Sequence, residues 1–389
     1  MSTHLDALER VITDAVAPRA AATDEQGSFP LPAVTALGEA GILGLTAGAD
    51  VGGGGGGMRD AAAVVERLAG VCGSTAMVVL MHYAAAAAIE AHGPKDVRQA
   101  IGRGRHLTTL ALSEAGSRSH FWAPVSTATA TAGGDGVVLD AVKSWVTSGA
   151  EADSYVWSSR PVDETAGPMT LWLVPSTAQG LSRPGGFDGV GLRGNGSVPV
   201  AADGVRLPLD ARLGPDGEGL DIGLATALPW FLVLSAAFSL GLLEAVTART
   251  GAHLGATRLE HLGETLVQQP IPRADYARLR LGTDRVRAFL NDTLTALETG
   301  RADAQLRVLE VKAVAAEEAA AGTDRAMKLC GGAAFRKETG IERHFRDSLA
   351  ARVMAPTTDA LLDFIGRAVS GLPLLGSPGG PGVTPGEAA

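Results

Sequence analysis

The sequence predicts an α+β fold in three consecutive parts: an N-terminal α-helical domain over residues 1–106, a middle antiparallel β-barrel or sandwich over 107–215, and a C-terminal helical bundle over 216–372. Two observations support this prediction. The spacing of apolar residues changes from three and four to two where the second part begins, and returns to the helical spacing where the third begins. With 389 residues and 46% hydrophobic composition, the chain can also bury a sizeable core. We expect the Gly- and Pro-rich tail, 373–389, to be disordered.

In the first part, proline, glycine and serine mark where helices begin and end. Apolar residues recur at helical spacing from the N-terminus until Pro18, which is expected to end the first helix. Pro30 opens a second helix that stops near Gly41. Ser74 is the expected N-cap of an alanine-rich helix that runs to Gly93. These signals predict a part made only of helices.

In the second part, polar and apolar residues alternate in short runs. Residues 125–132 alternate strictly, and the glycines of 133–136 supply a turn. Further strands are predicted at 137–139, 152–158 and 169–174, each bounded by Gly, Pro or Asp. Several short strands at this spacing are typical of a compact antiparallel barrel or sandwich.

In the third part, residues 224–243 carry no charge over about the 20 residues that a membrane-spanning helix needs. Pro229 and Gly241 dilute this stretch, no basic cluster flanks it on one side, and it continues into the amphipathic residues 244–254. We therefore expect a helix buried inside the bundle and no membrane partner.

Charge and cysteine content exclude several classes of function. The formal net charge is -9 and there is no basic run, so neither nucleic acid nor anionic lipid is an expected partner. Cys72 and Cys330 lie far apart, without a thiol or histidine at metal-ligand spacing, which indicates a reduced cytoplasmic protein without a metal site. The first ten residues lack the basic and apolar regions of a secretory signal.

Two motifs in the middle part carry the strongest functional signal. They read Leu112-Ser-Glu-Ala-Gly-Ser-Arg-Ser119 and Lys143-Ser-Trp-Val-Thr-Ser-Gly149. Near the C-terminus, Leu329-Cys-Gly-Gly332 and Glu342-Arg-His-Phe-Arg-Asp347 follow in a compatible order. With the glycine run at 52–57, these motifs resemble the acyl-CoA dehydrogenase superfamily over about residues 10–370. The resemblance implies the family's fold, in which the C-terminal part is a four-helix bundle.

The resemblance also implies a flavin cofactor, FAD with FMN as the alternative, and a homodimer or homotetramer, or else a heteromer. An isoalloxazine ring needs an aromatic wall and hydrogen-bond donors at its polar edge. Along a strand, alternation would put Trp145 and Thr147 on one face with Val146 between them; the alternative for Trp145 is an ordinary core aromatic. The cofactor contacts implied by the resemblance are Leu112, Ser113, Gly116, Ser119, Trp145, Val146, Thr147, Arg258, Gly331, Gly332 and Thr357.

Four of these contacts have individual interpretations. Gly331 and Gly332 would let a backbone approach a pyrophosphate or adenine, with helix packing as the alternative. Arg258 lies one position away from the family's arginine that reaches a neighbouring subunit's flavin phosphate. Ser119 and the following His120 are expected on the substrate side of the loop.

The sequence departs from the family where its catalytic base should be. Removal of an α-proton needs a carboxylate, but the usual glutamate position is occupied by Ala355. The second site that some members use holds Phe231 and Leu232. The candidate replacements are His120 and His82, although a lone histidine on an apolar helix is more often a core residue.

Three functional hypotheses follow. The first is a flavin-dependent oxidoreductase that acts on an acyl thioester or related small molecule with a relocated base. The second is a monooxygenase that takes reduced flavin and oxygen, as relatives without the glutamate do. The third is a non-catalytic partner subunit of a heteromeric acyl-CoA dehydrogenase.

Overall fold

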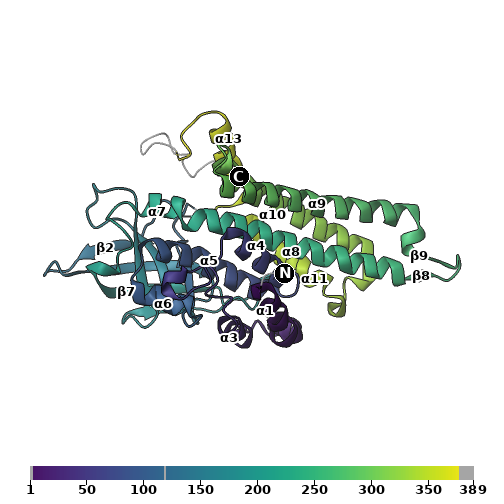
Figure 1. Ribbon diagram of the computed structural model, residues 1–389, viewed down its shortest axis with the longest axis horizontal. Helices are drawn as coiled ribbons and strands as arrows, with labels where there is room; N and C mark the ends of the chain where they lie inside the picture. Colours follow the sequence, from purple (N-terminus) through teal and green to yellow (C-terminus); the bar gives the residue numbers. More distant parts are fainter. Residues whose placement is uncertain (1–2, 118–119, 376–389) are drawn as a thin grey trace.

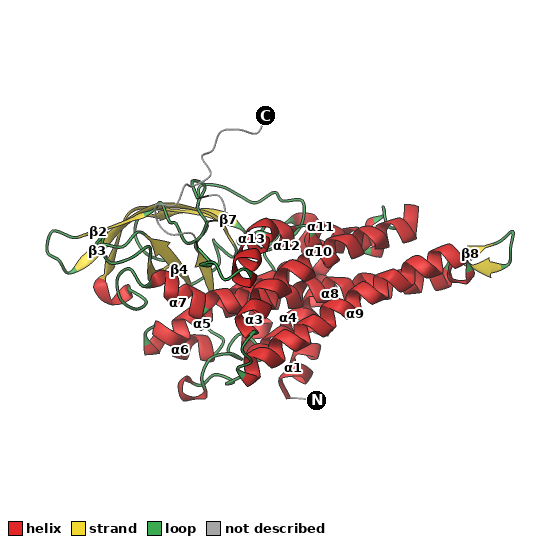
Figure 2. Ribbon diagram, turned by 90° about the horizontal axis from the view of Figure 1, so that it is seen from above, coloured by secondary structure: helices red, strands yellow, loops and turns green. Residues whose placement is uncertain are grey.

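The computed structural model describes residues 3–117 and 120–375. Figure 1 shows an elongated molecule with the strands β1–β7 gathered at one end and three long helices, α8, α9 and α10, side by side towards the other. Figure 2, turned by 90°, shows the same division and places the small hairpin that contains β8 at the far tip of the long helices. The mixed α+β architecture predicted from periodicity is confirmed.

The first part of the chain is helical, as predicted. Its α-helices are α1 (Thr3–Val11), α2 (Ala20–Gln26), α3 (Leu31–Glu39), α4 (Met58–Ala69), α5 (Gly73–His92) and α6 (Lys95–Gly102). Two details differ from expectation. The helical run does not end at Pro18, because Pro18 lies in the first turn of a 3-10 segment that leads into α2. Ser74 is not the cap of α5, which begins at Gly73; its hydroxyl instead accepts a hydrogen bond from Gly194 N at 3.1 Å.

The middle part consists of two sheets that enclose their own core. The strands are β1 (Thr108–Ala111), β2 (Thr127–Ala130), β3 (Gly136–Val146), β4 (Ser154–Ser159), β5 (Thr170–Pro175), β6 (Leu181–Ser182) and β7 (Val198–Pro208). The sheet orders are β1-β4-β5 and β2-β3-β7-β6. The pairing is not antiparallel throughout: β1 and β4 are parallel, because β2 and β3, which separate them in sequence, belong to the other sheet. Trp157, Trp172 and Val200 are buried in the core of this part.

The third part is built on three long helices. It contains α7 (Gly219–Ala225), α8 (Ala227–Ala256), β8 (Arg258–Leu259), β9 (Glu264–Thr265), α9 (Pro270–Thr299), α10 (Ala304–Cys330), α11 (Ile341–Ser348), α12 (Ala350–Val353) and α13 (Thr358–Val369). Among the described residues, α5 and the α7–α8 segment are long and apolar enough to cross a bilayer, but 78% and 83% of their apolar windows are buried. Both helices are core helices, as the diluted hydrophobicity of 224–243 predicts.

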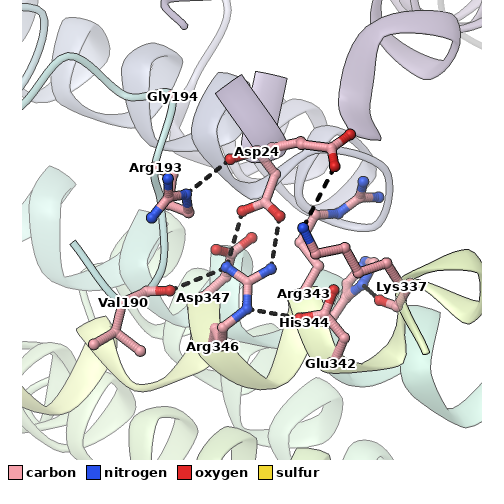
Figure 3. A network of polar contacts seen from close by, with 12 residues as sticks. Asp24, Val190, Arg193, Gly194, Lys337, Glu342, Arg343, His344, Arg346 and Asp347 are labelled. Atoms are coloured by element: carbon pink, nitrogen blue, oxygen red, sulfur yellow. Dashed lines mark hydrogen bonds and ion pairs between the residues drawn. The ribbon is translucent and has the colours of Figure 1, made fainter. Parts of the chain in front are cut away.

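All three parts meet at α11 (Figure 3). The guanidinium of Arg346 donates to both carboxylate oxygens of Asp24 on α2, at 3.0 and 2.6 Å, to Glu342 at 2.7 Å and to the Val190 carbonyl at 3.0 Å. The neighbouring Asp347 accepts from the Leu192 backbone N–H at 2.6 Å. Arg346 and Asp347 therefore bind different partners. Together they hold the N-terminal helices and the 190–194 loop against the C-terminal helices.

Candidate flavin and substrate site

A cavity opens where the middle sheets meet α5, α8 and the turn before α13. It has about 700 Å³ of empty space, part of it open to solvent, which is the size range of small-molecule sites. Residues from all of these elements line it, including Met81, Ser113, Ser144, Trp145, Phe231 and Ala355. Among the described residues, none that lines the cavity has a charged side chain.

Trp145 reaches this cavity because strand β3 bulges. The register with β7 shifts between Lys143 and Val146, and Trp145 has a positive φ of 53°. Its indole is 66% exposed, whereas Val146 and Thr147 are buried. Regular alternation, which would have put Trp145 and Thr147 on one face, was the wrong expectation, because the bulge turns the indole outward. The exposed aromatic face is nevertheless the feature that a flat isoalloxazine ring requires.

The bulge is anchored by a buried ion pair between Lys143 and Glu114. The Lys143 ammonium contacts the Glu114 carboxylate and donates to the Ser158 carbonyl at 2.6 Å, and both side chains are almost completely buried. Glu114 also accepts from the backbone N–H groups of Val125 and Ser126, at 2.6 and 3.2 Å. Glu114 therefore binds buried groups in the interior of the middle part.

Electrostatics of the pair follow from its burial. Burial raises the pKa of Glu114, but Lys143 and the hydrogen bonds from Ser126 and Val125 outweigh it and leave that pKa below its usual range. Burial lowers the pKa of Lys143 to about 8, although Glu114 opposes this change. The residues next to the pair, Ser113 and Ser144, line the cavity and are joined by a backbone hydrogen bond of 2.9 Å. The ion pair thus fixes one wall of the site.

Two positions at which the resemblance implies a catalytic carboxylate, Ala355 and Phe231, come to the cavity wall. Ala355 and Phe231 lie far apart in the sequence, but both line the cavity. Leu232 is buried in the helical core and does not line it. A methyl group and a phenyl ring cannot accept a proton, so neither side chain can act as a base at this wall.

The two histidines proposed as replacement bases do not line the cavity either. His82 is completely buried: one ring nitrogen donates to the Leu43 carbonyl at 3.0 Å and the other accepts from Thr108 N at 3.2 Å. Burial lowers its pKa to about 4, so the ring is neutral and both nitrogens are used. We correct its assignment from catalytic base to core residue. His120 is exposed, its Nδ1 donates to the Ser117 carbonyl at 2.9 Å, and its ring packs edge-on against Trp122.

The remaining cofactor residues are spread over the chain. Leu112 lines the cavity, Gly116 lies on the adjacent loop and Ser119 falls outside the described residues. Thr147 shares a hydrogen bond of 3.1 Å with Ser197. Thr357 caps α13 by accepting from Ala360 N at 3.3 Å.

Arg258 and the glycine pair do not line this cavity in their own chain. Arg258 is exposed on β8, at the tip of the long helices (Figure 2), and donates to the Gly263 carbonyl at 3.1 Å. Gly331 adopts a φ of 51° just after α10, and a Cβ on Gly331 or Gly332 would meet no atom within 4 Å. Helix packing therefore does not explain either glycine, and this surface is open to a ligand or a second chain.

We expect Trp145→Ala to lose most of its bound flavin, because the exposed indole is the only aromatic face that β3 presents to the cavity. The flavin-to-protein absorbance ratio after gel filtration measures the loss. Val142→Ala, an exposed position on the same strand, is the matched control and should retain flavin. Unchanged flavin content in a folded Trp145→Ala protein would contradict this placement of the ring.

Comparison with known proteins finds family models and proteins that are similar to this chain. Three family models match: acyl-CoA dehydrogenase N-terminal domain over residues 3–103, middle domain over 109–205 and C-terminal domain over 217–370. The human mitochondrial short-chain specific acyl-CoA dehydrogenase is 27% identical over 350 residues, covering 88% of this chain and 83% of that protein. Cyclohex-1-ene-1-carbonyl-CoA dehydrogenase from Geobacter metallireducens is 24% identical over 371 residues, covering 94% and 96%.

Solved structures show the same fold at low sequence identity. Butyryl-CoA dehydrogenase from Megasphaera elsdenii superposes with a TM-score of 0.88 at 20% identity, covering 95% of this chain and 98% of that one. The prolyl acyl carrier protein oxidase AnaB superposes with a TM-score of 0.86 at 18% identity, covering 95% and 99%.

Proposed function

The chain belongs to the acyl-CoA dehydrogenase family, and from this premise we propose that it is a flavin-dependent oxidoreductase whose reaction needs no carboxylate base from the protein. The coarser part of this statement, an FAD-dependent flavoprotein oxidoreductase, follows from membership of the family. The finer part rests on one observation: the cavity beside Trp145 has Ala355 and Phe231 where a base would stand, and no charged side chain among its described lining residues.

This observation favours oxygenation over α,β-dehydrogenation. Dehydrogenation of an acyl thioester requires a group that takes the α-proton as hydride leaves the β-carbon. The hypothesis of a relocated base loses its support, because neither His82 nor His120 lines the cavity. Oxygenation does not require this proton transfer. When bound, the reduced flavin supplies two electrons, one oxygen atom of O2 enters the product and the other leaves as water.

The residues of the cavity suit such a reaction on a small, mainly apolar substrate. Trp145 provides the stacking face, and the apolar walls formed by Phe231 and Met81 exclude water from the reacting atoms. The hydroxyl groups of Ser113 and Ser144 are the polar side chains that orient a substrate there. Relatives are named for CoA thioesters and for a carrier-protein oxidation, so a thioester-linked substrate is part of this proposal.

Assembly into a homodimer or homotetramer, with a heteromer as the alternative, is also proposed. Arg258 and the Gly331–Gly332 turn do not line the cavity of their own chain, and the side chain of Phe335 beside that turn is 86% exposed. These features support a neighbouring chain's cofactor as their ligand. A cytoplasmic location is proposed from the free, buried Cys72 and Cys330.

Anaerobic and aerobic flavin spectroscopy tests the proposed reaction. Butyryl-CoA is expected to leave the oxidised flavin unbleached without oxygen, whereas dithionite-reduced protein should be reoxidised rapidly when oxygen is admitted. Ala355→Glu, which restores a carboxylate at the cavity wall, is the comparison. Stoichiometric bleaching of the wild-type flavin by butyryl-CoA would overturn the proposal in favour of dehydrogenation. Failure of the folded protein to bind FAD would favour the non-catalytic subunit, which the open cavity argues against.

A further inference from the structure

Lys312 is a buried cation directly behind the end wall of the cavity. It projects from α10 and is 1% exposed. Its ammonium donates to three backbone carbonyls, those of Ala351 at 3.0 Å, Met354 at 3.1 Å and Pro356 at 2.9 Å. An ammonium has three N–H donors and no acceptor, so its capacity matches these three carbonyls. One side chain thereby holds the whole turn between α12 and α13.

This positive charge has no acidic partner among the ion pairs of the described residues. The acid on the neighbouring turn of α10, Glu317, pairs with Arg352 at 2.7 Å. Lys143, the other fully buried lysine, is by contrast neutralised by Glu114. Burial lowers the pKa of Lys312 to about 7, while the three carbonyl dipoles, one from the last turn of α12, favour the charged form.

The charge lies one layer of atoms away from the cavity. The ammonium is 5.9 Å from the centre of the Phe231 ring and bonded to the Pro356 carbonyl, and both residues line the cavity. Ala355, between two of the bonded residues, faces the same space. With a carboxylate at position 355, the lysine would sit behind a negative wall. With alanine there, its field reaches the cavity uncompensated by any side-chain charge.

We propose that Lys312 is a specificity-determining positioning residue, which fixes the 351–356 turn and selects substrates that present an anionic oxygen, such as a carboxylate, to the Ala355 wall. The inference rests on the proposed assignment of this cavity as the substrate site. It names the chemical class that the cavity takes: a small apolar body with a negatively charged oxygen at one end.

Calorimetric titration with a matched pair of probes tests this selectivity. Butanoate and butyramide have similar size and shape and differ in charge. The wild-type protein, purified with its flavin and titrated below the pKa of Lys312, is expected to bind butanoate about tenfold more tightly, a ratio that corresponds to about 1.4 kcal/mol. Lys312→Met should abolish this preference, and Lys312→Arg should retain it. Lys328→Met removes a 78% exposed lysine of the same helix and should change nothing.

A second variant keeps the test decisive if Lys312→Met does not fold. Ala355→Glu places a carboxylate between Lys312 and the probe, and should reverse the preference towards butyramide. Equal binding of the two probes by the wild type, or a preference that survives both Lys312→Met and Ala355→Glu, would overturn the inference. The titration needs no turnover and no oxygen, so a protein that selects butanoate but dehydrogenates butyryl-CoA would refute the proposed reaction and leave this inference standing.

Discussion

Replacing Lys143 with methionine is expected to lower the free energy of unfolding by about 3–5 kcal/mol, because it leaves the Glu114 carboxylate buried without its cation. The methionine fills most of the lysine's volume, so the loss is electrostatic and not a packing defect. Urea unfolding at neutral pH, followed by far-UV circular dichroism, measures it.

The double variant Glu114→Gln/Lys143→Met tests whether the loss of stability comes from the unpaired carboxylate. Without the charge at Glu114 the unpaired-carboxylate penalty disappears, and we expect the double variant to be more stable than Lys143→Met alone. A Lys143→Met protein as stable as the wild type would show that Glu114 is not held as a carboxylate.

The same substitution is expected to weaken flavin retention. Ser144 and Trp145 follow Lys143 directly, and we expect the fixed lysine at the start of the bulge to maintain the positive φ of Trp145. Flavin content should therefore fall in the double variant as well, even where stability recovers. Full retention of flavin in the double variant would mean that the bulge holds Trp145 without the ion pair.

The sequence predicted the order of elements because apolar periodicity reports directly which faces are buried. The alternating residues 125–129 and the charge-free helix around Leu234 follow this pattern in the structure, whereas β4 and most of β5 are buried on both faces. Local alternation failed at Trp145, where an inserted residue reverses the side-chain direction and no turn residue announces it.

The charged groups behind the cavity were missed for a different reason. In the sequence, Glu114 is one residue of the Leu112–Ser119 motif and nothing distinguishes Lys312, since pairing across 29 residues or across a helix–turn junction leaves no periodic signal. The signal that could have found them is a lone lysine in an otherwise apolar or alternating segment, because such a lysine must find partners when buried.

Asp347→Asn is expected to make the free energy of unfolding less dependent on pH and to stabilise the protein above about pH 7. Asp347 is buried and accepts from Leu192 N, while Arg346 turns away to Asp24 (Figure 3). Burial, together with the negative charge of Asp24, raises its pKa to about 7. Asparagine keeps an acceptor for the Leu192 N–H but carries no charge.

The sign follows from proton binding. Between the unfolded-state pKa of about 4 and the folded value of about 7, the folded protein binds the proton that the unfolded chain has released, so this contribution to stability is lost as pH rises. A shift of about three units sets an upper bound of about 4 kcal/mol. His82 and His344 act in the opposite direction, because burial lowers both pKa values to about 4 and their contribution grows as pH rises.

The test therefore compares the free energy of unfolding of the wild type with that of Asp347→Asn. The histidines are common to both proteins, so their contributions cancel in the difference. Urea unfolding between pH 5 and 8 measures the free energy of unfolding of both proteins. The value for the asparagine variant should rise relative to that of the wild type as pH increases. Asp324→Asn, which removes an exposed carboxylate on α10, is the matched control for the loss of a single carboxylate. A constant difference for Asp347→Asn would mean that the Leu192 N–H and the adjacent start of α5 keep this carboxylate ionised throughout, and that the three-part junction contains a charged and not a protonated Asp347.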